Sequence, residues 1–305
     1  MDNEPGNTIP MSMIMDKLNI CPNHKTKNES FYPSPFHPQQ LPTFSIKTNT
    51  NEWYDESLET GGTLIDFVCA YLAFQKEAST KADATRWIYN MVRIPEHLPL
   101  ALQGNEKRHQ REDAPLVFKK AGLIEHLGLI RYLEKQGIPL AVAQQHLKQV
   151  YILHKKTRKH LFVLGFDNEE GGYELRNPFF KGCLRPKALS FIRGSVPGTA
   201  TVHVFKSCWD FLSARTRNIA PFKSDSLVLN AYECLGQVYP YLQHYGYRTL
   251  YSWMDHDAAG RQATAYLSHS IHSIEGLHHK TMSPVFAPHR DVHTWHLARL
   301  GNAEA

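Results

Sequence analysis

The chain has 305 residues, of which 42% are hydrophobic and 21% charged, with 34 Lys and Arg against 29 Asp and Glu. This composition excludes a wholly disordered chain. The length predicts two or three domains at roughly 100–200 residues each. The net charge of +5 is too small to identify a polyanion as partner. No apolar run approaches the ~20 residues that cross a bilayer, and the N-terminus lacks the order of a signal peptide, so we expect a cytoplasmic protein with no membrane partner.

The first quarter of the chain predicts a small module of a β-hairpin and a helix. Residues 1–30 are polar and rich in Pro and Asn after a short apolar patch, so we expect an irregular lead-in there. Residues 43–54 have the pattern of two strands joined by an Asn-Thr-Asn turn. After a Gly-Gly break, apolar residues recur at helical spacing between residues 64 and 72. We therefore place a module at residues 31–76.

The next segment predicts a helix and a boundary between domains. Residues 77–115 contain one amphipathic helical pattern, followed by a charged linker at residues 104–113. Beyond the linker, a helix stops at Gly137 and Pro139 begins the next element. The chain therefore enters a second structural region after residue 115.

Two β-hairpins are predicted in this second region, which we place at residues 116–199. Strand patterns at residues 150–153 and 161–166 flank a basic turn. A Gly-Gly turn then leads into another strand at residues 173–176.

The last third of the chain alternates short β-branched runs with helical segments. The runs lie at residues 201–205, 227–230 and 249–254, and the helices are expected at residues 209–215, 231–245 and 258–270. This alternation is typical of a parallel α/β sheet, so the predicted fold class is α/β within an α+β whole. Ligands of such sheets gather at the carboxyl ends of the strands. The residues after each run therefore become candidates, above all Lys206 to Asp210, Asn230 and Asp255 to Gly260.

The sharpest motif is the Asp-His-Asp sequence at Asp255 and Asp257. Two carboxylates at the end of a strand can share a hard cation such as Mg²⁺. An Ala-Ala-Gly run follows and lets the next helix begin close to the strand. The alternative is an acidic helix N-terminus, which the helix dipole favours without any metal.

Residues 204–213 together with residues 255–261 resemble the Toprim domain, the metal-dependent fold shared by bacterial primases, topoisomerases and related nucleases. More narrowly, the chain resembles the Toprim primase-like proteins of Bacteroides-type mobile elements, in which a degenerate zinc-ribbon module precedes a bacterial primase core. The resemblance spans roughly residues 20 to 298. Further matching segments are residues 34–37, 42–46, 53–55, 61–66, 132–140, 171–177 and 181–182.

The resemblance implies a Toprim domain at residues 200–298, preceded by the N-terminal part of a primase-like core. It also implies a primase-type nucleotidyltransferase, a DNA-directed RNA polymerase that acts on single-stranded DNA and nucleotides. Asp255, Asp257 and Asp210 would be its catalytic residues, and Asp291 would join the Asp pair in holding Mg²⁺ or Mn²⁺. Helicase or mobilisation proteins are expected partners in the replication or mobilisation of a mobile element.

The first Toprim motif departs from the family pattern, because Lys206-Ser207 stands where the family has Glu-Gly. At ~4 Å and an effective dielectric of ~20, one charge–charge contact amounts to about 4 kcal/mol before desolvation. Our hypothesis is that the Lys206 ammonium takes the place of metal charge beside Asp255 and Asp257. The alternative is that Lys206 points to solvent and the Asp pair still holds a weakly bound ion. Two further readings stay open, a non-catalytic DNA- or protein-binding relative (a mobile-element or defence accessory) and a Toprim nuclease.

The ribbon-like module also departs from its family. Ser34 stands at the first cysteine position, His37 remains, and the following hairpin has no cysteine. A structural zinc site needs four N or S ligands, and the five scattered cysteines of the chain form no CxxC pair, so we expect no zinc. Near the C-terminus Asp291 matches the family, whereas Thr294 stands at the second acidic position.

Basic residues provide candidates for a path along a template strand. The resemblance places the region of the two hairpins and the segment after them against the template, where phosphate contacts are plausible. For the hairpin tip the alternative is a solvated turn. Phe179 and Phe180 are expected in the core rather than on bases. The candidate nucleic-acid-binding residues are Lys155, Lys156, Arg158, Lys159, Arg176, Lys181, Arg185 and Arg193.

Overall fold

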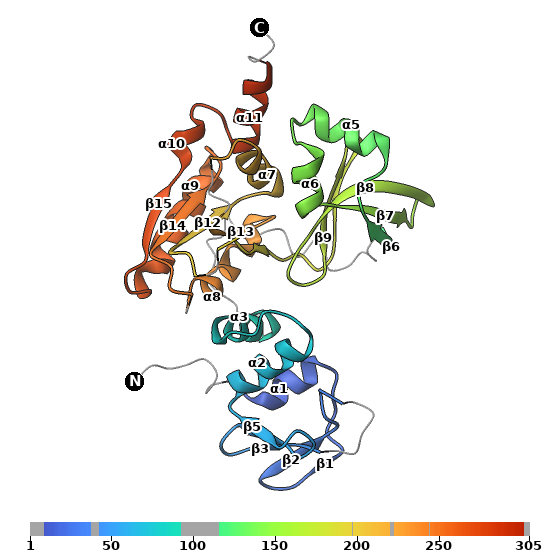
Figure 1. The fold of residues 1–305 in the computed structure, drawn as a ribbon, viewed down its shortest axis with the longest axis vertical. Coiled ribbons are helices and arrows are strands. Elements are labelled where there is room, and N and C mark those ends of the chain that lie inside the picture. Colours follow the sequence, from blue (N-terminus) through green and yellow to red (C-terminus); the bar gives the residue numbers. More distant parts are fainter. Residues whose placement is uncertain are drawn as a thin grey trace. The chain divides into compact units, whose positions relative to one another are not determined.

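The computed structural model describes residues 9–37, 43–92, 116–196, 198–219, 223–243 and 245–301 (Figure 1). The chain divides into two compact units, unit 1 with residues 1–96 and 240–245, and unit 2 with residues 97–239 and 246–305. Two antiparallel sheets and one mixed, mostly parallel sheet, each with helices, confirm the predicted α/β class within an α+β whole. The predicted linker at residues 104–113 lies outside the described residues. In the described part of the chain, no helix is long and apolar enough to cross a membrane.

In its described residues, unit 1 has an antiparallel sheet in the order β1-β2-β3-β4-β5, accompanied by the helices α1, α2 and α3. Its core is aromatic: the rings of Phe44 and Trp53 stack at 5.4 Å, and Phe67 packs against both. A capping box of Thr63 and Asp66 starts the helix that carries Phe67. The elements are β1 (His24–Lys25), β2 (Glu29–Tyr32), β3 (Phe44–Lys47), β4 (Glu52–Asp55), β5 (Thr60–Gly62), α1 (Met11–Lys17), α2 (Leu64–Phe74) and α3 (Lys81–Val92).

The structure corrects the expectation of an irregular lead-in over residues 1–30. The short apolar patch forms α1, whose residues Met11, Ile14 and Met15 are buried in the core of unit 1. The polar residues that follow form β1, an edge strand of the sheet, and the start of β2 beside it. The sequence pattern is weak here because β1 has two residues, both exposed, and β2 has four.

A buried carboxylate joins β4 to the loop that carries Ser34. Asp55 is fully buried and accepts hydrogen bonds from the hydroxyls of Ser34 (2.6 Å), Thr43 (3.0 Å) and Ser57 (2.6 Å). Burial raises the pKa of Asp55, but these hydrogen bonds outweigh burial and bring the pKa below its usual value. Ser34, which stands at the first cysteine position of the family pattern, is therefore a partner of a carboxylate.

The antiparallel sheet of unit 2 has the order β10-β9-β8-β7-β6. The predicted hairpin is confirmed, since β7 pairs with β8 from Lys148↔Gly165 to His154↔Lys159. The basic turn lies between them. The strands of this sheet are β6 (Leu116–Gly122), β7 (Lys148–His154), β8 (Lys159–Asp167), β9 (Tyr173–Asn177) and β10 (Phe180–Leu184), and the helices between β6 and β7 are α5 (Leu127–Lys135) and α6 (Leu140–His146).

The mixed sheet of unit 2 has the order β11-β13-β12-β14-β15. Strand β12 runs parallel to β13 and β14, β14 runs parallel to β15, and β11 is antiparallel to β13. The elements are β11 (Ser190–Ile192), β12 (Thr201–Phe205), β13 (Asp225–Val228), β14 (Thr249–Trp253), β15 (His278–Thr281), α7 (Cys208–Thr216), η2 (Tyr232–Gln237), α9 (Ala258–Ser270), η3 (Ile271–Ser273), α10 (Ser283–Phe286) and α11 (Val292–Gly301). Between η2 and β14 in the chain comes α8 (Tyr239–Leu242), of which residues 240–242 belong to unit 1.

Two predictions in this region differ from the structure. The single helix expected at residues 231–245 is split into the 3₁₀ helix η2 and the short α8, because Pro240 has no N–H to continue a helix. The run expected at residues 227–230 starts earlier and ends at Val228, and Asn230 has a positive φ of 63° that ends extended structure. Strands β11 and β15 went unpredicted because they are short edge strands.

The register of the parallel strands sets the location of the candidate site. Phe205 pairs with both Val228 and Trp253. The residues that follow these three therefore emerge at one edge of the sheet, which is where ligands of such sheets bind.

Candidate functional site at the edge of the mixed sheet

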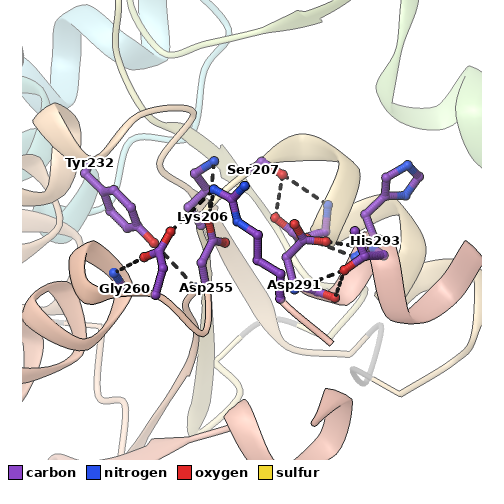
Figure 2. A network of polar contacts seen from close by, with 11 residues as sticks. Lys206, Ser207, Tyr232, Asp255, Gly260, Asp291 and His293 are labelled. Carbon is purple, nitrogen blue, oxygen red and sulfur yellow. Dashed lines mark hydrogen bonds and ion pairs between the residues drawn. The ribbon is translucent and has the colours of Figure 1, made fainter. Parts of the chain in front are cut away.

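The predicted acidic residues meet Lys206 at the carboxyl edge of the mixed sheet. Lys206 follows β12, and Asp255 follows β14 (Figure 2). A pocket of about 320 Å³ opens here, and residues of both sheets of unit 2 line it. Its polar lining residues are Glu174, Arg176, Lys181, Lys206, Ser207, Asp210, Asn230, Asp255, Arg290, Asp291, His293 and Thr294.

Two cationic side chains pair with the Asp-His-Asp motif. The Lys206 Nζ lies 3.8 Å from Asp255 Oδ2, and the Arg290 Nη2 lies 3.7 Å from the same oxygen. Arg290 also lies 3.4 Å from Asp257 Oδ2. Lys206 thus faces Asp255 rather than solvent, and Arg290 pairs with both carboxylates. Sequence reasoning did not single out Arg290, although it directly precedes Asp291 in the matched segment.

Asp255 is the buried member of this group, with 4% of its side chain exposed. Burial raises the pKa of Asp255, the Lys206 charge opposes that rise, and the nearby Asp291 and Asp257 reinforce it. The backbone N–H of Asp255 donates to the Tyr232 hydroxyl at 3.4 Å, and the Lys206 Nζ lies 5.9 Å from the centre of the Tyr232 ring (Figure 2). Lys206 is therefore held between a carboxylate and an aromatic ring.

The donor set does not fit the divalent cation that the Toprim resemblance implies. Across the described ranges, no group of three or more His, Cys, Asp and Glu side chains is arranged to hold a metal ion. Asp257 Oδ1 accepts the Gly260 N–H at 2.8 Å and caps α9, while Asp291 Oδ1 accepts the Thr294 N–H at 2.7 Å. Mg²⁺ prefers several oxygen ligands with uncompensated charge, whereas Asp255 and Asp257 here already face Lys206 and Arg290.

Asp210 lies within the same site but is buried. Its Oδ2 accepts a hydrogen bond from Ser207, the N-cap of α7, and its Oδ1 accepts the His293 N–H at 3.1 Å. Burial raises the pKa of Asp210 to about 7, and the charges of Asp291 and Asp255 add to the rise. Near neutral pH this carboxyl is therefore partly protonated and links α7 to α11.

Glu174 is a second perturbed carboxyl in the pocket wall, and sequence reasoning did not assign it a role. Burial raises its pKa to about 7, against the opposing charges of Lys187 and Lys181. The signal available in the sequence was the alternation of β9, which places Glu174 on the same face as Arg176.

The candidate nucleic-acid-binding residues separate into groups. Arg176 and Lys181 line the pocket, and the Arg176 guanidinium lies 5.5 Å from the centre of the Trp209 ring. Arg193 lies 4.0 Å from Asp225, and Arg185 is exposed after β10. The remaining four, Lys155, Lys156, Arg158 and Lys159, lie at the exposed tip of the β7–β8 hairpin.

Gly260 is required by the close approach of α9 to the strand end. A Cβ at this position would lie 2.0 Å from the Asp255 carbonyl oxygen. We expect Gly260→Ala to lower the free energy of unfolding by about 1–3 kcal/mol, because the backbone around Asp255 must move. Denaturant unfolding measures the loss, and Gly122→Ala, whose Cβ meets nothing within 4 Å, is the control. An unchanged stability of Gly260→Ala would contradict this.

Comparison with known proteins adds a distant likeness. A family model described as a domain of unknown function (DUF8464) matches residues 118–185. No curated protein matches the chain. The primase of Aquifex aeolicus (zinc-binding and RNA polymerase domains) is similar with a TM-score of 0.41 and 14% identity, over 98% of this chain and 82% of that chain. The primase fragment of the bacteriophage T7 primase-helicase is similar with a TM-score of 0.38 and 13% identity, over 86% and 92%.

Proposed function

We propose that the protein is a primase-related Toprim protein that binds single-stranded DNA and in which metal-dependent nucleotidyl transfer is lost or strongly weakened. The observation that carries the proposal is the Lys206 ammonium 3.8 Å from the buried Asp255 carboxylate. Lysine there supplies a positive charge at the place where the family pattern has a carboxylate. A divalent cation would therefore meet one repulsion more and one attraction fewer.

Binding of DNA is supported by the distribution of positive charge in unit 2. The exposed hairpin tip and the pocket residues Arg176 and Lys181 belong to one antiparallel sheet. Lys and Arg side chains neutralise phosphates without reading base sequence. Replication or mobilisation of a mobile element, with helicase or mobilisation proteins as partners, is the setting that the family resemblance suggests.

The test compares DNA binding with primer synthesis on the same protein. We expect single-stranded DNA to bind in the presence of EDTA, with an affinity that falls as salt rises, and no primer to form with Mg²⁺ or Mn²⁺. The double variant Lys155→Ala/Arg158→Ala should bind at least fivefold more weakly, since each lost phosphate contact removes counterion release.

A control variant and two contrary outcomes define the limits of the proposal. Lys135→Ala/Lys280→Ala removes two exposed charges elsewhere in unit 2 and should leave binding unchanged. Primer synthesis that Asp255→Ala abolishes would show an active enzyme and overturn the loss of catalysis. Absence of DNA binding by the unaltered protein would overturn the proposal as a whole.

A further inference from the structure

An aromatic ladder crosses one face of the antiparallel sheet in unit 2. Tyr151 on β7 pairs with Phe162 on β8, and their rings lie 4.8 Å apart. His160 stacks on Tyr151 at 5.1 Å and 14°, and His126 stacks on Phe162 at 5.0 Å and 27°. On β6, Lys120 pairs with Tyr151. We call Tyr151, Phe162, His160 and His126 the aromatic platform.

The platform is not part of the hydrophobic core. Side chains alternate between the faces of a strand, and the neighbours on the other face, Val150 and Val163, are fully buried in the core of this sheet. Phe162, in contrast, keeps 39% of its surface exposed, and His160 and His126 are exposed. Packing within the sheet therefore does not account for this row of rings.

The platform adjoins the pocket of the candidate site. Leu164 lies two residues beyond Phe162 on the same face of β8 and pairs with Arg176. Both Leu164 and Arg176 line the pocket. Phe162 is thus the platform residue nearest along β8 to the residues that line the pocket.

Phe179 provides a further exposed ring, in a turn that is hydrogen-bonded to the backbone of Phe162. It lies in the turn between β9 and β10 and is 97% exposed, so the expectation that it packs in the core is wrong. Asn177 holds the turn, since its side chain donates to the Phe162 carbonyl at 3.0 Å and accepts from the Phe179 N–H at 2.9 Å. Phe180, the next residue, does pack against the core of this sheet.

The strands that carry the platform are strongly cationic. Residues 116–122 and 148–167, which hold β6, β7 and β8, contain seven Lys and Arg and one acidic residue, Asp167, which pairs with Lys148 at 2.6 Å. A ligand that fits such a surface has negative charge along its length and flat apolar faces. Unpaired nucleic acid has both, whereas the bases of a duplex are stacked on one another and unavailable. The cations other than Lys148 are Lys119, Lys120, Lys155, Lys156, Arg158 and Lys159.

We propose that the aromatic platform stacks unpaired bases of a single-stranded nucleic acid whose phosphates contact the surrounding lysines and arginines. This proposal rests on the proposed binding of single-stranded DNA and adds the mode of recognition. Stacking is tolerant of sequence because every base has a π-face. The strand would run from the hairpin tip across the platform toward the pocket.

The test removes the central ring. We expect Phe162→Ala and Phe162→Leu to weaken binding of a labelled oligothymidylate by about fivefold to a hundredfold. Phe162→Leu keeps the apolar contact with Tyr151 and guards against misfolding. Phe118→Ala is the matched control, because Phe118 is 45% exposed, pairs with Ile152 on the opposite face of the same sheet and stacks on Tyr173 at 5.9 Å.

A second ligand separates base stacking from phosphate binding. The unaltered protein should bind an abasic oligonucleotide of the same length more weakly than the oligothymidylate, by a factor similar to the loss that the Phe162 variants show on the oligothymidylate. On the abasic oligonucleotide, the Phe162 variants should bind almost as tightly as the unaltered protein. Equal loss on both oligonucleotides, or equal affinities of the Phe162 and Phe118 variants, would overturn the platform while leaving DNA binding intact. A Phe162 variant that loses self-association instead would identify a protein interface and also overturn it. Absence of DNA binding by the unaltered protein would overturn the proposed function as well.

Discussion

Lys206→Glu is expected to raise the affinity for Mn²⁺ or Mg²⁺ by about 100-fold or more. The substitution replaces the ammonium 3.8 Å from Asp255 with a carboxylate, so the local charge falls by two. At such a distance and an effective dielectric of ~20, each charge–charge contact amounts to about 4 kcal/mol, so losing one repulsion and gaining one attraction together amount to about 8 kcal/mol, more than half of which desolvation and salt offset. The remaining 3 kcal/mol or so corresponds to the expected factor.

Calorimetric titration with Mn²⁺ measures this affinity, and thermal unfolding provides a second readout. Without metal, the variant should unfold at a lower temperature than the unaltered protein, because a buried carboxylate has lost a counter-charge. Added Mn²⁺ should raise the unfolding temperature of the variant and leave the unaltered protein nearly unchanged.

Lys181→Glu is the matched control for the change in charge. Lys181 lines the same pocket, but its charge acts on Glu174. The control should therefore show no comparable gain in metal affinity. Tight Mn²⁺ binding by the unaltered protein would refute charge replacement by Lys206, as would a Lys206→Glu variant that gains none.

Asp210→Asn is expected to stabilise the protein above neutral pH by about 2–4 kcal/mol. The pKa of Asp210 rises from its ordinary 3.8 to about 7 in the folded chain. Between these values the unfolded chain binds fewer protons than the folded chain, so stability falls as pH rises. A difference of about three pKa units corresponds to about 4 kcal/mol at most. Asparagine keeps the site neutral, and its amide can donate to Ser207 while its oxygen accepts from His293.

Denaturant unfolding at pH 4.5 and pH 8 tests this prediction (both values chosen to lie on either side of ~7). The unaltered protein should be less stable at the higher pH, and Asp210→Asn should lose part of that dependence. Some dependence should remain, because burial also raises the pKa of Glu174 to about 7. Glu134→Gln, an exposed change on α5, should behave like the unaltered protein. A pH dependence of Asp210→Asn equal to that of the unaltered protein would contradict the buried carboxyl.

These expectations share one physical basis. The carboxyls at the edge of the mixed sheet differ in burial and in partners, and their charge states differ accordingly. Asp255 is buried beside Lys206, Asp257 caps a helix and pairs with Arg290, and Asp210 is held partly protonated by burial. The negative charge of these carboxyls is thus neutralised by the cationic side chains of Lys206 and Arg290 and by protonation of Asp210.

The sequence alone predicted much of this site because its signals are local. Short buried runs between helices indicated parallel strands, and parallel strands present their following residues at one edge. Lys206 and Asp255 each follow such a run, so their proximity was foreseeable. The hairpin of β7 and β8 was likewise readable from two alternating runs around a basic turn.

Only the tertiary structure decided how these residues pair and which of them are charged. Arg290 reaches Asp257 from a distant segment, and the raised pKa of Asp210 depends on burial by α7 and α11. The aromatic platform depends on the register that sets Tyr151 opposite Phe162. Side-chain periodicity is a property of a few consecutive residues, whereas register, burial and ion pairing arise when remote segments pack together. The sequence therefore determined where the chemistry gathers, and packing determined its charge and its exposed faces.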